Sequence, residues 1–390
     1  MYVPDQLCLI TASKMFVSGD DSYRSSLALD FTTNGGCSIL PKFWPVDSFR
    51  GVGGMLDNVP IFCDSANWKF QDDQKYKDLW DGCMLWKSGK WRRGPNMLTN
   101  RFQPAGIIMG NKLWITGGST CNGYEYRDLA PTGKHEYESR RRKNCDILLK
   151  STELISLEST EPFVDLPKPL IRHCIIKIND DLVMVTGGQT VLDEDPTESK
   201  RLFEKNTHFF SFSHQRWIPG PDMSLARREH ACGTFLMGDE TILVVAGGSM
   251  VVEGEMVLKS KPTDSVEFLS LQNLDNGWFK GPKLPHQMAL FPMLTSPNGK
   301  GLITIGGEIE ADTGIEAFDG VFELKCDDEV LDNCSWLESP FNMTQIVGEA
   351  IKKEVRHRIH GGRYNHVAFW IPEELDMCQP KQDEDQESEE

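Results

Sequence analysis

The stretch KLWITGGST, residues 112–120, decides the fold, because the chain carries the same pattern four times. An apolar run closed by two glycines returns as LVMVTGGQT (182–190), LVVAGGS (243–249) and LITIGGE (302–308). The pairs begin at Gly117, Gly187, Gly247 and Gly306, so successive pairs are 70, 60 and 59 residues apart. Such a period is too long for a solenoid unit and favours a repeated four-stranded β-sheet with insertions.

The residues around each pair complete the repeating unit. A second apolar run and a turn precede the pair, as in AGIIMGNKLWITGG (105–118), which predicts two antiparallel strands joined by a hairpin. A polar stretch follows the pair, and then an apolar alternating segment and an aromatic residue before proline, as in THFFSFSHQRWIPGPDM (207–223). Each unit is therefore expected to supply four strands.

The first third of the chain repeats the pattern weakly. KMFVSGD (14–20) keeps one glycine, and VPIFCDS (59–65) places Asp64 and Ser65 where the pair is expected. Counting both gives six units of about 65 residues each. The expected units span residues 1–48, 49–98, 99–170, 171–223, 224–285 and 286–343.

These units resemble the kelch repeat, which carries a glycine doublet after its second strand and an aromatic residue, usually Trp, on its fourth. The resemblance covers about residues 8–375 and is strongest in units three to six. It implies an all-β fold, a six-bladed β-propeller of kelch repeats with four antiparallel strands per blade. It also implies that the glycines form backbone corners and that the aromatic residues fill the space between blades. The structural residues so implied are Gly117, Gly118, Gly187, Gly188, Gly247, Gly248, Gly306, Gly307, Trp91, Trp217, Trp278 and Trp336.

A closing segment follows the sixth unit, at residues 344–378. Within it RYNHVAFWIPEEL (363–375) repeats the start of a unit, which predicts a strand that returns to pair with the N-terminal blade and closes the ring. Cys8 and Cys378 are then candidates for a disulfide across that junction. Residues 379–390 have no apolar side chain and dense negative charge, so we expect a disordered acidic tail.

Charge and hydropathy narrow the class of partner. The formal net charge is -17, which repels nucleic-acid phosphates, so nucleic acid is not expected as a partner. No apolar run approaches the ~18 residues that span a bilayer, so membrane insertion is not expected. We expect a monomer that binds a protein or a glycan, and no cofactor.

The cysteines and two glycosylation sequons bear on the compartment. Eleven cysteines favour disulfides, and the sequons at Asn333 and Asn342 point to the same extracellular setting. The N-terminus has no signal-peptide pattern, so a cytoplasmic protein with buried thiols is the alternative. The candidate disulfides within units are Cys63 with Cys83, Cys121 with Cys145 and Cys326 with Cys334.

Arginines and histidines gather at the starts of the unit-opening strands, which would surround one mouth of a propeller channel. They are Arg172, His173, Arg227, Arg228, His230, Arg363 and His366. One hypothesis is a ligand-binding rim, and a three-histidine metal site is a variant of it. The alternative is a structural role in which these side chains bind loop carbonyls.

The loops after the doublets form a second candidate surface, because a rigid scaffold concentrates binding residues on its loops. They cover residues 121–145, 191–205, 251–263 and 310–320. Their acidic residues favour either a basic partner or a solvated face.

The motifs that mark common enzymes are missing. The sequence contains no nucleophile elbow, P-loop or zinc-ligand spacing. The tyrosines lie mainly outside the expected strands, against a copper radical oxidase like galactose oxidase, whereas a sialic-acid epimerase of propeller fold needs only a few charged channel residues. We do not expect a ubiquitin-ligase adaptor, because the residues ahead of the repeats show no BTB-like helical pattern. We therefore expect a non-catalytic kelch-type scaffold that binds a protein or glycan through loops and channel mouth, with a carbohydrate-directed enzyme as the alternative.

Overall fold

The protein folds almost entirely into antiparallel β-sheets, as its repeats predict. The computed structural model describes residues 6–10, 26–30, 35–39, 51–66, 80–88, 90–120, 147–191, 201–251, 260–311, 314–327, 330–339 and 367–371. Two short 3-10 helices, η1 (Leu274–Asn276) and η3 (Leu331–Asn333), accompany the strands. No helix in this part of the chain is long and apolar enough to cross a membrane.

Four sheets have the strand content that the doublet-bearing units predict. Each contains four antiparallel strands from one continuous stretch of chain, and the strands lie side by side in the order in which they occur in the sequence. Sheet 3 contains β8 (Ala105–Met109), β9 (Lys112–Thr116), β12 (Thr152–Ile155) and β13 (Thr160–Phe163). Sheet 4 contains β14 (Cys174–Lys177), β15 (Leu182–Thr186), β18 (Thr207–Ser211) and β19 (Arg216–Pro219). Sheet 5 contains β20 (Ala231–Met237), β21 (Glu240–Ala246), β24 (Val266–Ser270) and β25 (Phe279–Lys280). Sheet 6 contains β27 (Met293–Thr295), β28 (Leu302–Ile305), β31 (Val321–Cys326) and β32 (Cys334–Glu338).

Sheet 2 shows what happens where a doublet is missing. It contains β4 (Val52–Leu56), β5 (Val59–Ala66), β6 (Trp80–Lys87) and β7 (Lys90–Asn96). The expectation of a corner at Asp64 and Ser65 is wrong, because β5 continues through both residues and pairs them with Gly82 and Asp81. Without glycines to adopt left-handed backbone angles, the strand stays extended.

Sheet 1 joins the two ends of the described chain. It contains β1 (Gln6–Ile10), β2 (Ser26–Asp30), β3 (Gly35–Ile39) and β33 (Val367–Ile371). β33 pairs with β1 in antiparallel register, with Cys8 opposite Phe369. The predicted strand at residues 14–20 lies outside the described residues.

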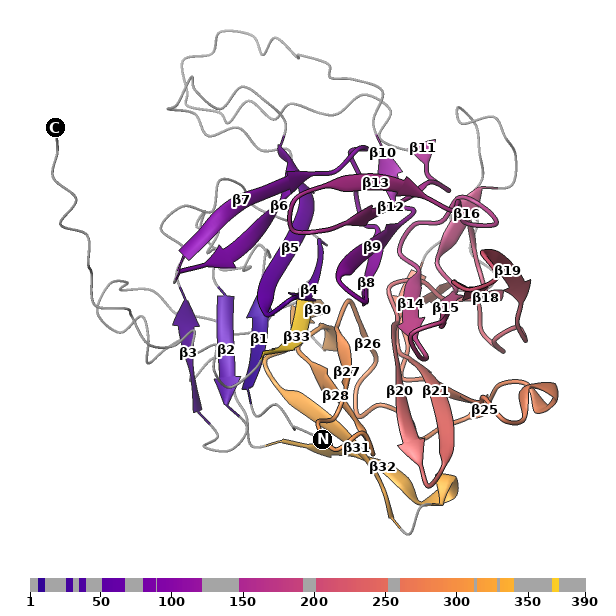
Figure 1. Cartoon of the computed structure of the whole chain (residues 1–390). Coiled ribbons are helices and arrows are strands. Elements are labelled where there is room, and N and C mark those ends of the chain that lie inside the picture. The colour runs from indigo at the N-terminus through magenta and orange to yellow at the C-terminus, as the bar shows by residue number, and fades with distance from the viewer. Residues whose placement is uncertain are drawn as a thin grey trace, which may run out of the picture.

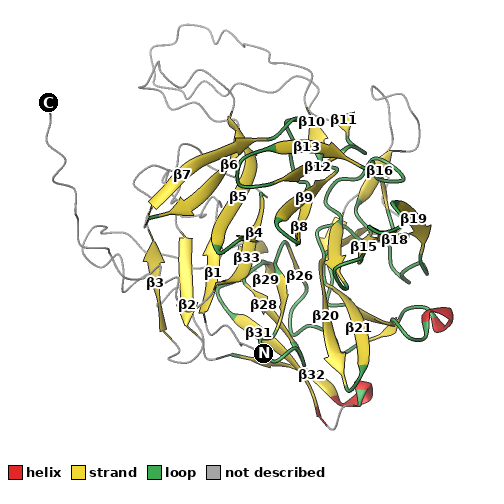
Figure 2. Cartoon of the chain, in the orientation of Figure 1, coloured by secondary structure: helices red, strands yellow, loops and turns green. Residues whose placement is uncertain are grey.

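The sheets lie radially. Sheets 2 to 6 have their first strand inward, and sheet 1 has β33 there. Figure 1 shows β4, β8, β14, β20 and β33 near the centre and β3, β7, β13, β19 and β32 toward the outside. Neighbouring inner strands contact one another from β33 through β4, β8, β14, β20 and β27, and β27 in turn contacts β33. Figure 2 shows that strands dominate the whole arrangement. Several four-stranded antiparallel sheets with almost no helix are consistent with a propeller.

The core lies between neighbouring sheets. One cluster packs sheet 5 on sheet 6 through Phe235, Phe268 and Phe322, and similar clusters join sheets 2 and 3, 3 and 4, and 4 and 5. Each cluster removes apolar side chains of two sheets from water, at about 25 cal/mol per Å2, so no sheet is a stable unit alone.

Tryptophans in or next to the outer strands link neighbouring sheets by hydrogen bonds. The indole N–H of Trp217 donates to Asp165 O at 2.8 Å, that of Trp278 to Pro221 O at 2.9 Å and that of Trp336 to Pro282 O at 3.0 Å. Each acceptor belongs to the segment after the last strand of the preceding sheet. Phe163 takes the corresponding place in sheet 3 and stacks on Phe212 at 5.7 Å. The backbone of Trp91 lies in β7 opposite Trp86.

The doublet glycines form left-handed corners that touch the next unit. Gly187 and Gly188 have φ of 55° and 95°, and the other three doublets repeat these signs. The N–H of Gly188 donates to Arg227 O at 2.8 Å, and a Cβ on Gly187 would meet the same oxygen at 2.6 Å. The doublet is thus a close approach between two units, which only glycine permits.

Candidate functional site

A cavity of about 190 Å3 lies where the inner strands begin. Gln103, Arg172 and Glu229 supply polar groups to its wall, and Leu290, Phe291 and Pro292 form an apolar part. Gly51, Pro104, His173 and His230 complete the lining. The residues come from sheets 2 to 6, so the cavity is a shared feature of the inner strands.

Four lining residues at equivalent positions have left-handed backbone angles. Gln103, Arg172, Glu229 and Leu290 have φ of 56°, 59°, 60° and 62°. This conformation costs a non-glycine residue about 1–2 kcal/mol. Main-chain hydrogen bonds hold it: Arg172 N donates to Gln103 O at 3.3 Å, Glu229 N to Arg172 O at 3.0 Å and Leu290 N to Glu229 O at 3.0 Å. Strained residues persist where the surroundings hold them, and they cluster at functional sites.

The polar side chains of this row bind one another. Arg172 Nη1 lies 2.8 Å from Glu229 Oε1, and Arg172 Nε donates to Gln103 Oε1. Ser249 Oγ donates to the second carboxylate oxygen of Glu229 at 3.0 Å. The Arg172 and Glu229 side chains are 19% and 7% exposed, so the pair meets the cavity while most of it is shielded. We call Gln103, Arg172, Glu229 and Leu290 the mouth row.

His173 and His230 follow the mouth-row residues Arg172 and Glu229 in sequence. Each imidazole packs between two units, against the first glycine of the preceding doublet, and we call such a side chain a wedge. His173 Nε2 lies 2.8 Å from Thr116 Oγ1, and His230 Nε2 lies 2.8 Å from Thr186 Oγ1. The hydroxyl of Thr116 donates to Ala105 O, so it accepts from Nε2–H, and His173 is the neutral tautomer with its proton on Nε2. Burial lowers the pKa of His173 to about 3. The pKa of His230 is lowered well below its usual value by burial first, and then by Arg227 and His173.

The next unit replaces this polar wedge by an apolar one. Phe291 packs on Gly247 as His230 packs on Gly187, and Ala246 stands where Thr186 stands. Histidine therefore occurs with threonine before the doublet, and phenylalanine occurs with alanine. Because the residue types change together, the pairing is explained by packing between units.

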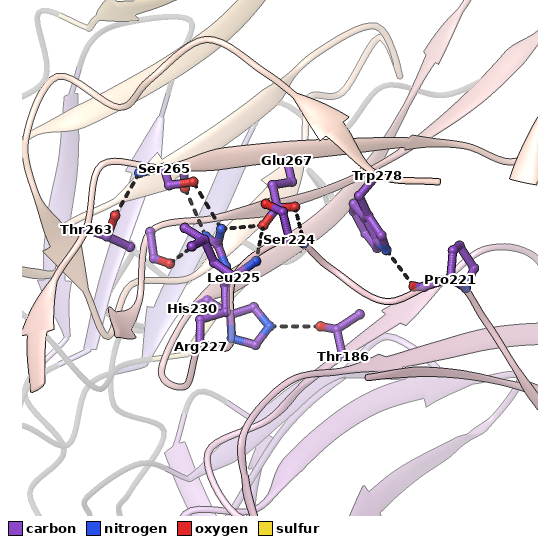
Figure 3. Close-up of polar contacts among 11 residues, drawn as sticks. Thr186, Pro221, Ser224, Leu225, Arg227, His230, Thr263, Ser265, Glu267 and Trp278 are labelled. Atoms are coloured by element: carbon purple, nitrogen blue, oxygen red, sulfur yellow. Dashed lines mark hydrogen bonds and ion pairs between the residues drawn. The ribbon is translucent and has the colours of Figure 1, made fainter. Parts of the chain in front are cut away.

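Arg227 does not line the cavity, and its bonds to main-chain carbonyls match the structural role that the sequence left open. Its side chain is fully buried. Figure 3 shows it directed toward Ser265 and Glu267. Nη1 donates to Gly247 O and Ser265 O, both at 2.9 Å, and Nη2 lies 2.7 Å from Glu267 Oε1.

The same buried arrangement occurs in sheet 3. Arg101 donates to Gly117 O at 2.9 Å and to Ser151 O at 2.7 Å, and it pairs with Glu153. The second carboxylate oxygen of each glutamate accepts from a main-chain N–H group. Glu153 accepts from Leu98 N, and Glu267 accepts from Ser224 N. Each buried charge is thus paired and hydrogen-bonded, as its burial requires.

Arg228 joins two ribbons, and its Nε also lies 3.5 Å from Glu229 Oε2 in the mouth row. These ribbons are β16 (Gln189–Val191) with β17 (Arg201–Phe203), and β22 (Ser249–Val251) with β23 (Ser260–Pro262). Arg228 donates to Gln189 Oε1 at 2.7 Å and to Ser260 Oγ at 3.1 Å, and its guanidinium lies 4.7 Å from the centre of the Phe203 ring.

The loops after the doublets therefore begin as ribbons beside the mouth. β10 (Ser119–Thr120) with β11 (Ile147–Leu148) follows the first doublet, and β29 (Glu308–Ala311) pairs with β30 (Gly314–Ala317) and β26 (Met288–Ala289) after the last. Arg363 and His366 lie outside the described residues. In the described part of the chain, no three histidine, cysteine, aspartate or glutamate side chains come together as metal ligands.

A second cavity, of about 300 Å3, lies between the ends of sheets 3 and 4. Pro167 and Pro219 form apolar walls, and Lys168, His208 and Asp222 are its titratable groups. Lys168 is bound to Glu204 Oε2 at 2.7 Å and to Asn206 Oδ1 at 2.9 Å. Burial, and then Lys168, lowers the pKa of His208.

Three disulfides lie in the described sheets. Cys63–Cys83 and Cys326–Cys334 join residues that face each other on paired strands, as the sequence predicts. Cys174–Cys232 joins the inner strands of sheets 4 and 5 and was not predicted. It lies just past the Arg172–Glu229 pair, so the same two sheets are linked twice near the mouth. Cys121, Cys145 and Cys378 are outside the described residues, and so is the side chain of Cys8.

Comparison with known proteins supports the fold and leaves the family open. No family model matches the sequence, and no curated protein matches it. Among solved structures the chain is similar to YjhT, with a TM-score of 0.59 and 14% identity over 80% of this chain and 91% of that chain. The fold is propeller-like. At this identity the likeness shows the fold alone.

Proposed function

We propose that the chain is a six-bladed kelch-type propeller closed by β33, and that it is a non-catalytic scaffold which binds a protein or glycan partner. The mouth row carries the proposal. Four equivalent residues have left-handed backbone angles, which are unfavourable for residues other than glycine, and all four line one cavity. The ribbons lie beside this cavity. Scaffolds with variable loops commonly use this arrangement for binding.

The chemistry of the cavity favours an uncharged polar group. Arg172 and Glu229 neutralise each other, and Gln103 adds an amide, so the wall offers donors and acceptors with little net charge. Leu290 and Phe291 add an apolar surface to the same wall. A sugar ring has hydroxyl groups and an apolar face, and a peptide segment has amides and side chains, so both fit this description. The volume of about 190 Å3 suits one such group, with the rest of the partner on the ribbons.

The pairing of the charged groups supports binding over catalysis. Glu229 already accepts from Arg172 and Ser249, and both cavity histidines are held neutral by burial. A general base needs a pKa near the working pH and access to a substrate proton. Glu229 is still a carboxylate at the mouth, and this single observation favours the second candidate function, an enzyme that acts on a carbohydrate there.

The test compares the full-length protein with two variants on an array of neutral oligosaccharides and peptides. Arg172→Met together with Leu290→Glu removes both kinds of cavity surface, and Asn333→Gln changes a distant surface as the control. We expect ligands that bind the wild type and the control and lose at least tenfold in affinity with the mouth variant. Ligands that bind all three equally would contradict the proposal. Turnover of a bound sugar that Glu229→Gln abolishes without loss of binding would establish the enzyme instead.

A further inference from the structure

The turn between the two outer strands of sheet 6 presents an exposed asparagine. η3 ends at Asn333, and β32 begins at the next residue. Main-chain bonds shape the turn: Asn333 N donates to Val330 O at 3.0 Å, and Val330 N donates to Asp327 O at 3.2 Å. The side chain of Asn333 is exposed, and within the described residues its amide makes no hydrogen bond. The amide nitrogen is therefore accessible.

Asn333 begins the sequence Asn333-Cys334-Ser335, which is an acceptor for N-linked glycosylation because its middle residue is not proline. Cys334 points inward, where it is bonded to Cys326, and Ser335 points outward on the edge strand. β32 pairs only with β31, so one side of the acceptor sequence is not covered by another strand in the described sheet. Both side chains that the reaction requires are on the surface.

The disulfides favour the compartment in which this modification occurs. Disulfides persist in oxidising environments such as the lumen of the secretory pathway, and they are rare in the cytosol. Cys174–Cys232 joins residues 58 apart in sequence, so the long-range fold itself includes an oxidised pair. Cys326–Cys334 closes the loop that contains Asn333.

We propose that Asn333 carries an N-linked glycan. A bond forms between Nδ2 of Asn333 and the anomeric carbon of an oligosaccharide held on a lipid diphosphate. The bond from that carbon to the diphosphate breaks, the diphosphate leaves with the electron pair, and the amide proton passes to a base of the transferase. A glycan at this place is bulky and solvated, and it covers the outer edge of sheet 6.

The glycan would lie on the face opposite the mouth row. β31 begins with Val321 paired with Ile305, next to the doublet Gly306–Gly307, and Leu324 pairs with Leu302 farther away. Cys326 and the turn lie beyond that point. The proposal therefore does not rest on the proposed binding function, and a change at Asn333 leaves the mouth free.

The test uses the full-length protein isolated from the cells that make it. Peptide N-glycosidase treatment in heavy-oxygen water converts a glycosylated asparagine to labelled aspartate, which mass spectrometry locates. We expect the label at residue 333 in most chains. An unmodified Asn333 in protein with a closed Cys326–Cys334 disulfide, or a label at Asn342 alone, would overturn the proposal.

Variants expressed in a eukaryotic secretory host provide the matched control. Ser335→Ala removes the acceptor sequence and Ser335→Thr keeps it, and both change the same exposed side chain. We expect the wild type and Ser335→Thr to lose the mass of one more glycan on treatment than Ser335→Ala and Asn333→Gln. Equal mass losses in all four proteins would show that Asn333 is not used.

Discussion

Arg172 and Glu229 are joined twice across the boundary between sheets 4 and 5. Their side chains form an ion pair of 2.8 Å, and Glu229 N donates to Arg172 O at 3.0 Å. The main-chain bond fixes both left-handed residues, so the side-chain pair forms with little further loss of freedom. The pair therefore belongs to the rigid part of the molecule, although its edge faces the cavity.

A double-mutant cycle measures that pair. We expect Arg172→Met and Glu229→Gln each to lower the free energy of unfolding by about 1–2 kcal/mol. We expect the double variant to lose less than the sum, with a coupling of about 1 kcal/mol in urea unfolding. The control is Lys112 with Glu161, whose side chains are 35% and 53% exposed. Their coupling should stay below about 0.5 kcal/mol, and equal couplings in the two cycles would refute the rigid pair.

Arg227 and Arg228 are adjacent in sequence and are expected to differ strongly on substitution. Arg227→Met leaves the buried Glu267 carboxylate without its ion-pair partner, so we expect a loss of about 3–5 kcal/mol in the free energy of unfolding. Arg228 is 18% exposed, its Nε lies 3.5 Å from Glu229 Oε2, and its other bonds go to neutral side chains of the ribbons. Because Glu229 keeps Arg172 as an ion-pair partner, Arg228→Met should cost only about 1 kcal/mol. Urea unfolding monitored by tryptophan fluorescence compares the two. Similar losses would show that the Arg227 cluster is no more than a surface contact.

A glycine of the doublet can be compared with a turn glycine to separate the cost of a left-handed backbone from the cost of a steric clash. Gly187 and Gly110 have nearly the same φ, 55° and 57°, but a Cβ on Gly187 would meet Arg227 O at 2.6 Å while one on Gly110 meets nothing within 4 Å. We expect Gly110→Ala to cost about 1–2 kcal/mol, the penalty of a left-handed residue alone. Gly187→Ala should cost clearly more, because the clash is added. Equal thermal stability of the two variants would mean that the corner relaxes freely.

The sequence predicts the sheets well because their signals are local. Alternating apolar residues, hairpin turns and the doublets specify strands and corners within a few residues of one another. The disulfides Cys63–Cys83 and Cys326–Cys334 follow from strand register in the same way. Strand register could not predict Cys174–Cys232, because this disulfide depends on the distance between two separate sheets.

The mouth row was partly missed for a related reason. Gln103 and Glu229 occupy the same position as Arg172, but the residue type changes in every unit, so no repeated letter marks them. Their shared left-handed backbone is visible only in three dimensions. Arg227 was a rim candidate because it lies at the start of a unit-opening strand, whereas its partner Glu267 lies 40 residues further along the chain.

The buried histidines make the protein sensitive to acid. The pKa of His173 is about 3 in the folded protein and near 6.5 in the unfolded chain, and that of His230 is also lowered. Below pH 6.5 the unfolded chain therefore binds protons that the folded protein does not. Stability is lost progressively as the pH falls from about 6.5 toward 3, by about 2 kcal/mol for His173 at pH 5, and His230 adds a loss of the same sign.

The protein supplies its own control for this effect. Thr116→Ala with His173→Phe copies the Ala246–Phe291 pair of sheets 5 and 6, which fills the same wedge without a titrating group. At pH 7 we expect this double variant to stay within about 1.5 kcal/mol of the wild type, as a swap of similar shape does. Urea unfolding between pH 7 and pH 5 should show a loss smaller by about 2 kcal/mol in the variant than in the wild type. Carboxylates contribute equally to both proteins, so identical pH dependence would mean that folding does not lower the pKa of His173.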